Sequence, residues 1–222
     1  MPEKNFVSKN HQSTTRDYLA RVNNIEMPKF KAAELAKQWG FHYWDGDRSI
    51  NYGGHHYKPG YWKWTVENLI SEYGLNSSSR VLDIGCGKGF LLKELLDLIP
   101  EIEIVGLDIS RYAIENCHPD LVKNLKVGNA NALPFDDKEF DLAISINTFH
   151  NLHNFDLYSA LTEITRVSQN QFICVESYRN ELEKMNLLYW QVTCEAFNNP
   201  SEWKWWFDLT GYKGDYEFIY FE

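Results

Sequence analysis

The sequence has no long apolar run and no apolar leader. No stretch approaches the ~18 uninterrupted apolar residues that a helix needs to cross a bilayer. The first ten residues, MPEKNFVSKN, are polar and mixed in charge, and they lack the apolar core of a secretory signal peptide. These absences predict a soluble, cytoplasmic protein with no membrane partner.

Paired cysteines and metal-ligand clusters are also missing. The four cysteines lie far apart without a CxxC pair, which favours reduced thiols over a disulfide framework or a zinc site: Cys86, Cys117, Cys174 and Cys194. The histidine pairs at 55–56 and 150–153 have no acidic partner at ligand spacing, although Asp45 or Asp47 could be added from elsewhere. We therefore expect no metal.

Positive charge is scarce. The 222 residues include 31 acidic and 22 basic side chains, a net charge of -9, and no Lys/Arg-rich segment could follow a phosphate backbone. This balance argues against nucleic acid as a partner or substrate. The length suits one large domain, or one domain with a small cap.

Short apolar runs alternate with helical periodicity through the second half of the chain. We expect strands at 81–84, 101–108, 125–129, 141–146 and 171–176, and helices at 90–99, 110–117 and 156–168. Two further helices, at 182–197 and 201–209, precede one last strand at 217–221. Strands that alternate with helices predict a doubly wound, mostly parallel α/β sheet with helices on both faces.

The first 75 residues differ from this core domain, which we place at 76–222. They hold helical candidates at 16–22 and 29–39, then a loop rich in glycine and aromatics, WDGDRSINYGGHHYKPGYW. All eight tryptophans lie outside residues 76–176, and we expect them mainly to pack flanking segments onto the core. We interpret 1–75 as a helical and aromatic cap over the carboxyl ends of the strands.

The stretch VLDIGCGKGF (81–90) joins the first strand to a helix through three alternating glycines. It is not a P-loop, because Lys88 is followed by Gly89 and Phe90 instead of the Ser or Thr that binds magnesium. It also departs from the dinucleotide fingerprint GxGxxG, whose third glycine is replaced by Phe90. The turn therefore predicts a nucleotide-type ligand that needs no phosphate cradle.

Polar residues follow the other strands where ligands bind in open α/β sheets. Asp108 ends the second strand, 21 residues past Gly87, and its carboxylate could accept hydrogen bonds from both hydroxyls of a ribose. Asn129 and Ala130 follow the third strand, and Asn147 follows the fourth. These positions predict a nucleoside site.

The segments VLDIGCGKG, GLDIS and GNANALPFDDKEFDLAIS together resemble the class I S-adenosylmethionine-dependent methyltransferases over roughly 80–176. The resemblance implies a Rossmann-like sheet and S-adenosyl-L-methionine as cofactor, with S-adenosyl-L-homocysteine as product. It assigns cofactor contacts to Asp83, Gly85, Cys86, Gly87, Asp108, Ile109, Asn129, Ala130 and Asn147. The family often has an acidic residue at the position of Asn129, and it usually ends its sheet with two strands, so one or two C-terminal strands are both open here.

Methyl transfer is an in-line displacement, and it needs a base only when the nucleophile carries a proton. Candidates are His150, His153 and His56, with His55 beside the last, and His150 is favoured because it follows the fourth strand by three residues. The alternative for His150 is a structural histidine that anchors its loop.

The acceptor is expected to be a small molecule, because SINTFHN lacks the NPPY-type signature of enzymes that methylate adenine or planar amides. The stretch FHYWDGDRSINYGGHHYKPGYW resembles bacterial methyltransferases associated with surface-polysaccharide gene sets, which implies an amino sugar or a sugar nucleotide. We expect Asp45, Asp47, Arg48 and Tyr52 to line the acceptor pocket, unless Arg48 merely pairs with one of these carboxylates.

Two rival functions are a non-catalytic partner subunit with this fold and a nicotinamide-dependent oxidoreductase. The intact motifs disfavour the first rival, and Phe90 disfavours the second. A monomer and a homodimer are both compatible with the sequence.

Overall fold

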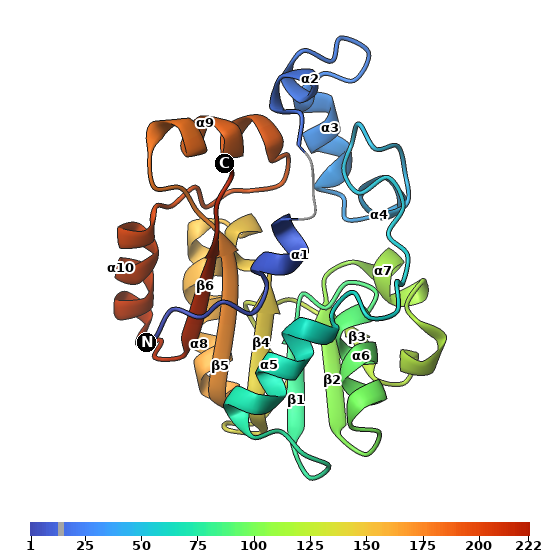
Figure 1. Cartoon of the computed structure of the whole chain (residues 1–222), viewed down its shortest axis with the longest axis vertical. Helices are drawn as coiled ribbons and strands as arrows, with labels where there is room; N and C mark the ends of the chain where they lie inside the picture. Colours follow the sequence, from blue (N-terminus) through green and yellow to red (C-terminus); the bar gives the residue numbers. More distant parts are fainter. Residues whose placement is uncertain (13–15) are drawn as a thin grey trace.

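A computed structural model describes residues 1–12 and 16–222, which form a six-stranded sheet in the order β3-β2-β1-β4-β5-β6. Every neighbouring pair of strands is parallel, as expected of a doubly wound fold (Figure 1). The strands are β1 (Arg80–Ile84), β2 (Glu103–Asp108), β3 (Leu125–Val127), β4 (Phe140–Ile146), β5 (Ser168–Glu176) and β6 (Asp215–Ile219). The order reverses between β1 and β4, which places the ligand-binding crevice at the carboxyl ends of these two strands.

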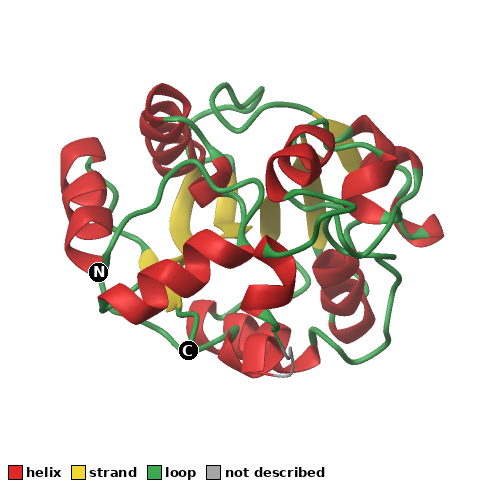
Figure 2. Cartoon of the chain, turned by 90° about the horizontal axis from the view of Figure 1, so that it is seen from above, coloured by secondary structure: helices red, strands yellow, loops and turns green. Residues whose placement is uncertain are grey.

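Helices cover both faces of this sheet (Figure 2). Val81 on one face of β1 belongs to a core cluster with α5 and α6, whereas Leu82 on the other face belongs to a cluster with α8 and α10. The helices are α1 (Ser8–Gln12), α2 (Tyr18–Val22), α3 (Lys29–Ala36), α4 (Phe41–Trp44), α5 (Lys63–Tyr73), α6 (Phe90–Leu98), α7 (Arg111–Glu115), α8 (Asn154–Val167), α9 (Glu181–Trp190) and α10 (Pro200–Thr210), with 3-10 turns η1 (Pro119–Leu121) and η2 (Phe149–Asn151). The layered α/β architecture is therefore confirmed.

Two of the expected helices end earlier than predicted, and one helix was not predicted. The helix expected at 182–197 ends at Trp190, because the chain then turns back to the β4 loop, where Glu195 N and Ala196 N both donate to His150 O at 2.9 Å. The helix expected at 29–39 ends at Ala36. Helix α5 was not anticipated, although Gly74 ends it in the left-handed conformation.

The last edge of the sheet is built by β6 and by the amino terminus. Within the described residues β6 is the one strand that follows α10, and it runs parallel to β5, which settles the open choice in favour of one strand. Glu3 forms a parallel bridge with Tyr216, and the first residues run beside β6 (Figure 1). Phe6 N and Val7 N then donate to the buried carboxylate of Glu217 at 2.6 and 2.9 Å. The amino terminus thereby covers part of the free edge.

Phe6→Ala is expected to lower the free energy of unfolding by about 3–4 kcal/mol, because a buried aromatic ring is deleted without a replacement. The Phe6 side chain is 7% exposed and its ring centroid lies 5.2 Å from that of Phe172 on β5. Ile25→Ala, at a side chain that is 91% exposed, is the control and should change stability little. Urea unfolding measures both, and a loss below ~1 kcal/mol in Phe6→Ala would show that the edge is dispensable.

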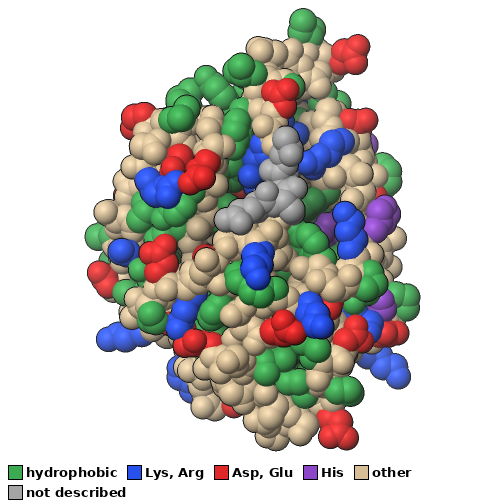
Figure 3. Space-filling model, in the orientation of Figure 1, with side chains coloured by type: hydrophobic (Ala, Val, Ile, Leu, Met, Phe, Trp, Pro, Cys, Tyr) green, Lys and Arg blue, Asp and Glu red, His purple; other side chains and the backbone are tan. Residues whose placement is uncertain are grey.

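The segments α2 to α4 lie at the end of the sheet where the strands end (Figure 1). Lys88, in the glycine turn after β1, pairs with Asp45 after α4 at 2.7 Å, and Trp44 Nε1 donates to Ser110 Oγ at 2.9 Å. Figure 3 shows Lys and Arg interspersed with Asp and Glu over the visible face. In the described part of the chain, no helix is long and apolar enough to span a membrane.

Candidate cofactor and acceptor site

The turn after β1 brings backbone, cap and β4 loop into close contact. Gly85 N and Cys86 N donate to Leu107 O at 2.7 and 3.2 Å, which ties the turn to β2. A Cβ atom on Gly85, whose φ is 81°, would lie 1.9 Å from Thr148 Oγ1, so no other residue fits there. A Cβ atom on Gly87 would lie 2.7 Å from the Trp44 ring, so the cap packs directly on the turn.

Two buried carboxylates lie beside this turn. Asp108 accepts hydrogen bonds from Gly87 N at 2.8 Å and from Ser110 N at 2.7 Å, whereas the described residues give the Asp83 carboxylate no hydrogen bond and no ion pair. Burial, and then the charge of Asp108, raise the pKa of Asp83 to about 7. Burial also raises the pKa of Asp108, against its two backbone hydrogen bonds. A cationic group beside these carboxylates would therefore be stabilised.

A first cavity of about 300 Å³ opens at the carboxyl ends of β1, β2 and β4. Six of the residues expected to contact the cofactor line it: Gly85, Asp108, Ile109, Asn129, Ala130 and Asn147. The structure does not bring Asp83, Cys86 or Gly87 to its surface, because Cys86 packs in the core and Trp44 covers Gly87. The first cavity thus keeps most of the predicted nucleoside site but not the inner part of the glycine turn.

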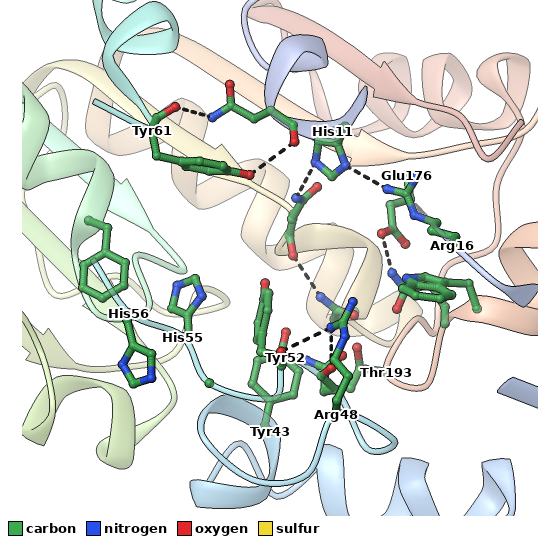
Figure 4. A pocket seen from close by; sticks show the side chains of 18 of the residues that line it. His11, Arg16, Tyr43, Arg48, Tyr52, His55, His56, Tyr61, Glu176 and Thr193 are labelled. Atoms are coloured by element: carbon green, nitrogen blue, oxygen red, sulfur yellow. Dashed lines mark hydrogen bonds between the residues drawn. The ribbon is translucent and has the colours of Figure 1, made fainter. Parts of the chain in front are cut away.

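A second cavity of about 340 Å³ adjoins the first. The two share Tyr43, Tyr52, Asn147, Asn151 and Thr193 as lining residues, so a common wall separates them. Figure 4 shows the second cavity, with Arg16, Arg48 and Glu176 on one side and His55 and His56 on the other. Its lining comes from the amino terminus, the cap, the β4 loop, β5 and the segment after α9.

Of the four predicted substrate residues, the structure places two at the second cavity. Arg48 and Tyr52 line the second cavity, but Asp45 and Asp47 line neither. Asp45 accepts hydrogen bonds from Lys88, from Tyr112 and from His55 N, and these lower its pKa to about 2 although burial acts the other way. Asp47 accepts a bond from Ser49 N at 2.7 Å, within its own turn. Among the described residues neither carboxylate pairs with Arg48, and the substrate roles of these residues stay a prediction.

The predicted catalytic histidines do not all line the same cavity. His150 and His56 line the second cavity, with His55, whereas His153 is exposed at the start of α8 and lines the first. His150 itself is buried, and burial lowers its pKa to about 3. The buried imidazole of His150 is therefore a weaker base than an exposed histidine would be.

His150 contacts Glu176, the last residue of β5, through both ring nitrogens. Glu176 N donates to His150 Nδ1 at 3.3 Å, which leaves the proton on Nε2, 3.4 Å from Glu176 Oε2. This 3.4 Å contact is long for a hydrogen bond, and Oε2 has no hydrogen-bond partner among the described residues. Burial raises the pKa of Glu176 to about 8. Burial thus favours the protonated form of Glu176.

Three buried oxygens around the shared wall have no hydrogen-bond partner in the described chain: Asn147 Oδ1, Asn151 Oδ1 and Glu176 Oε2. All three residues line the second cavity. Buried oxygens without donors are costly, so their presence together indicates a ligand that brings donors. Asn147 is held there in the left-handed conformation, with φ of 58°.

Glu176 was missed in the sequence, although the rule that pointed to Asp108 applies equally to the end of β5. Arg16, Arg21 and Trp190 were also missed, because only the fold brings them to the same cavity. Among residues 1–12 and 16–222, no group of three or more His, Cys, Asp or Glu side chains is arranged to hold a metal ion.

The buried acids predict a fall in stability at mildly alkaline pH. Folding raises the pKa of Asp83 to about 7 and of Glu176 to about 8, so the folded state holds protons that the unfolded state has released. The lowered pKa values of His11, His55 and His150 oppose this, because the unfolded histidines, half protonated at about pH 6.5, lose their remaining protons as pH rises further. The net free energy of unfolding should drop by on the order of 1 kcal/mol between pH 6.5 and 8.

Glu176→Gln is the matched variant for this measurement, because it keeps the shape and cannot titrate. Denaturant titrations of the ligand-free protein across the pH series should show a flatter decline in Glu176→Gln than in the wild type. Equal slopes in the two proteins would mean that Glu176 does not hold the proton.

Comparison with known proteins agrees with this geometry. Residues 81–171 match the family described as Methyltransferase domain. An uncharacterized protein of Methanocaldococcus jannaschii is 37% identical over 115 residues, covering 52% of this chain and 43% of its own. An O-methyltransferase of Aspergillus nomiae is 34% identical over 113 residues, covering 46% and 49%. This chain thus spans less than half the length of either relative.

The solved structure of the YcgJ protein of Bacillus subtilis shares the fold, with a TM-score of 0.53 and 21% identity over 65% of this chain and 66% of that one. Residues 81–171 thus match the methyltransferase domain family, and the sheet has the fold of the YcgJ protein. This family and fold use S-adenosylmethionine as methyl donor.

Proposed function

We propose that this protein is a methyltransferase that transfers the methyl group of S-adenosylmethionine to a small molecule. The observation that carries the proposal is the pair of cavities with a common wall. One lies where a doubly wound sheet binds nucleosides, and the other holds buried oxygens that lack donors. Adjoining cavities would let the nucleophile of one bound molecule approach the methyl group of the other directly, as an in-line transfer requires.

The residues of the first cavity fit the cofactor. Asp108 would hold the ribose, and Ile109, Asn129 and Ala130 would frame the adenine. When bound, the cofactor supplies an electrophilic methyl group. The aromatic residues Trp44 and Tyr52, stacked with ring centroids 5.5 Å apart, would exclude water from it.

An amino sugar or a sugar nucleotide is the acceptor class that we propose. Amino and hydroxyl groups supply donors for Asn147 and Asn151, and a hydroxyl oxygen can accept the proton of the Glu176 carboxyl group. The cavity of about 340 Å³ has the size of a small-molecule site. The O-methyltransferase of Aspergillus nomiae supports a small acceptor in general, and the sugar is our own suggestion.

We assign the proton acceptor to Glu176 instead of His150. The free lone pair of His150, on Nδ1, already accepts from Glu176 N, and an imidazole with a pKa of about 3 is a weak base. Glu176 Oε2 is unpartnered and in the cavity. His150 would then act as a positioning residue that fixes the Glu176 backbone and carboxyl group.

The test is incubation of the protein with S-adenosylmethionine carrying a deuterated methyl group and a bacterial metabolite extract. Mass spectrometry should find a labelled small molecule that is absent without protein. Asn147→Leu, which fills the common wall with an apolar side chain, should abolish the label. If the cofactor binds and no product forms in any extract, a non-catalytic partner subunit is the better account.

A further inference from the structure

The acceptor cavity contains an unusual group of arginines. The chain has seven arginines, and four of them lie within 4.0 Å of a carboxylate oxygen: Arg80, Arg111, Arg166 and Arg179. The other three, Arg16, Arg21 and Arg48, have no ion pair among the described residues, and all three line this cavity. We call them the arginine cluster. Arginines without acidic partners that gather at one site indicate an anionic ligand.

The three guanidinium groups converge on one ring. Their carbon atoms lie 5.8 Å (Arg16), 5.3 Å (Arg21) and 5.6 Å (Arg48) from the centroid of Trp190. Burial, and then the charge of Arg48, lower the pKa of Arg21 to about 10. The charges of Arg21 and Arg48 therefore repel each other, and an anion bound between the arginines would relieve this repulsion.

The groups that contact the arginine cluster do little to neutralise its positive charge. Arg21 donates to Ile50 O at 2.7 Å and Ser49 O at 3.2 Å, and Arg48 donates to Asn51 O at 2.7 Å. Arg16 reaches His11 Nδ1 at 3.3 Å, while the buried Nε atoms of Arg16 and Arg21 have no partner. Glu176 is the single carboxylate in the described lining, and burial raises its pKa to about 8, although the charge of Arg16 acts the other way.

We propose that the arginine cluster binds a phosphate or diphosphate group of the methyl acceptor, which makes this enzyme specific for phosphorylated molecules. The inference rests on the proposed function and narrows its substrate. A carboxylate carries one negative charge, whereas a diphosphate carries more and presents oxygens to several guanidinium forks at once. The donors of the acceptor would then face Asn147, Asn151 and Glu176 at the common wall.

Calorimetry with inorganic pyrophosphate tests the cluster without knowledge of the full acceptor. The wild type should bind pyrophosphate, and Arg16→Met should weaken binding by tenfold or more, because one charge-assisted contact is lost. Arg16→Lys should recover part of the affinity. Arg48→Met should weaken binding similarly. The control is Arg111→Met, at an exposed arginine on α7 outside both cavities, and it should bind as the wild type does.

The affinity for S-adenosylhomocysteine is measured on the same samples. It distinguishes the methyltransferase proposal from the phosphate inference and shows whether each variant is folded. Intact S-adenosylhomocysteine binding with no pyrophosphate binding, or with pyrophosphate binding that the Arg16 and Arg48 variants share unchanged, would overturn the phosphate inference and leave the methyltransferase proposal standing. Acetate that binds as tightly as pyrophosphate would also overturn it. If the wild type does not bind S-adenosylhomocysteine, the result would instead contradict the proposed function.

Discussion

Asp108→Ala is expected to weaken the binding of S-adenosylmethionine by about ten- to a hundredfold, because the charge-assisted bond to the ribose is worth about 1.5–3 kcal/mol. The carboxylate also accepts from Gly87 N and Ser110 N, so its loss loosens the glycine turn that forms the same site. Both effects weaken the binding of S-adenosylmethionine. Calorimetry with S-adenosylhomocysteine measures the change.

The matched control is Asp208→Ala, which removes an exposed carboxylate on α10, far from either cavity's lining. Its cofactor affinity should equal that of the wild type. Unchanged affinity in a folded Asp108→Ala protein would remove Asp108 from the cofactor site.

Glu176→Gln is expected to lower kcat by roughly a hundredfold while cofactor affinity stays nearly intact, which is the size typical of general-base loss. The wild-type rate should rise with pH through about 8, because the raised pKa of Glu176 means that its basic form appears only there. This limb should vanish in Glu176→Gln. The measurement is the pH dependence of initial rate with the product identified from the labelling experiment.

His150→Gln serves as the comparison, since it tests the residue that positions Glu176. Its effect should be smaller, and the alkaline limb should persist with a shifted midpoint. A full hundredfold loss in His150→Gln together with a normal rate in Glu176→Gln would return the base to His150.

Much of the nucleotide site could be predicted from the sequence, because its residues directly follow the predicted strands. Asp108 and Asn147 follow strands directly, and in a parallel sheet strand ends meet at one edge, so six expected cofactor residues line one cavity. The burial of the inner part of the glycine turn could not be predicted, because it depends on contact between Gly87 and Trp44, which lie 43 positions apart in the sequence. The division of the chain at residue 75 stays a prediction, although Phe6 already packs in the sheet core.

The acceptor site depends on long-range contacts that no local pattern encodes. Arg16, Arg48 and Trp190 come from three separate segments and meet only in the fold. The chemistry of His150 also escaped the sequence, since burial moves its pKa to about 3 and burial is not visible in a motif. The rate limb near pH 6.5 that an ordinary histidine would give is therefore replaced by one near 8.

The most direct test of the two-cavity account is a crystal structure with S-adenosylhomocysteine. The account predicts its ribose against Asp108, its adenine beside Ile109 and Asn129, and its sulfur facing the common wall at Asn147, toward the cavity that holds Glu176. A ligand bound in the arginine-lined cavity instead, or one whose sulfur points away from Asn147, would contradict it.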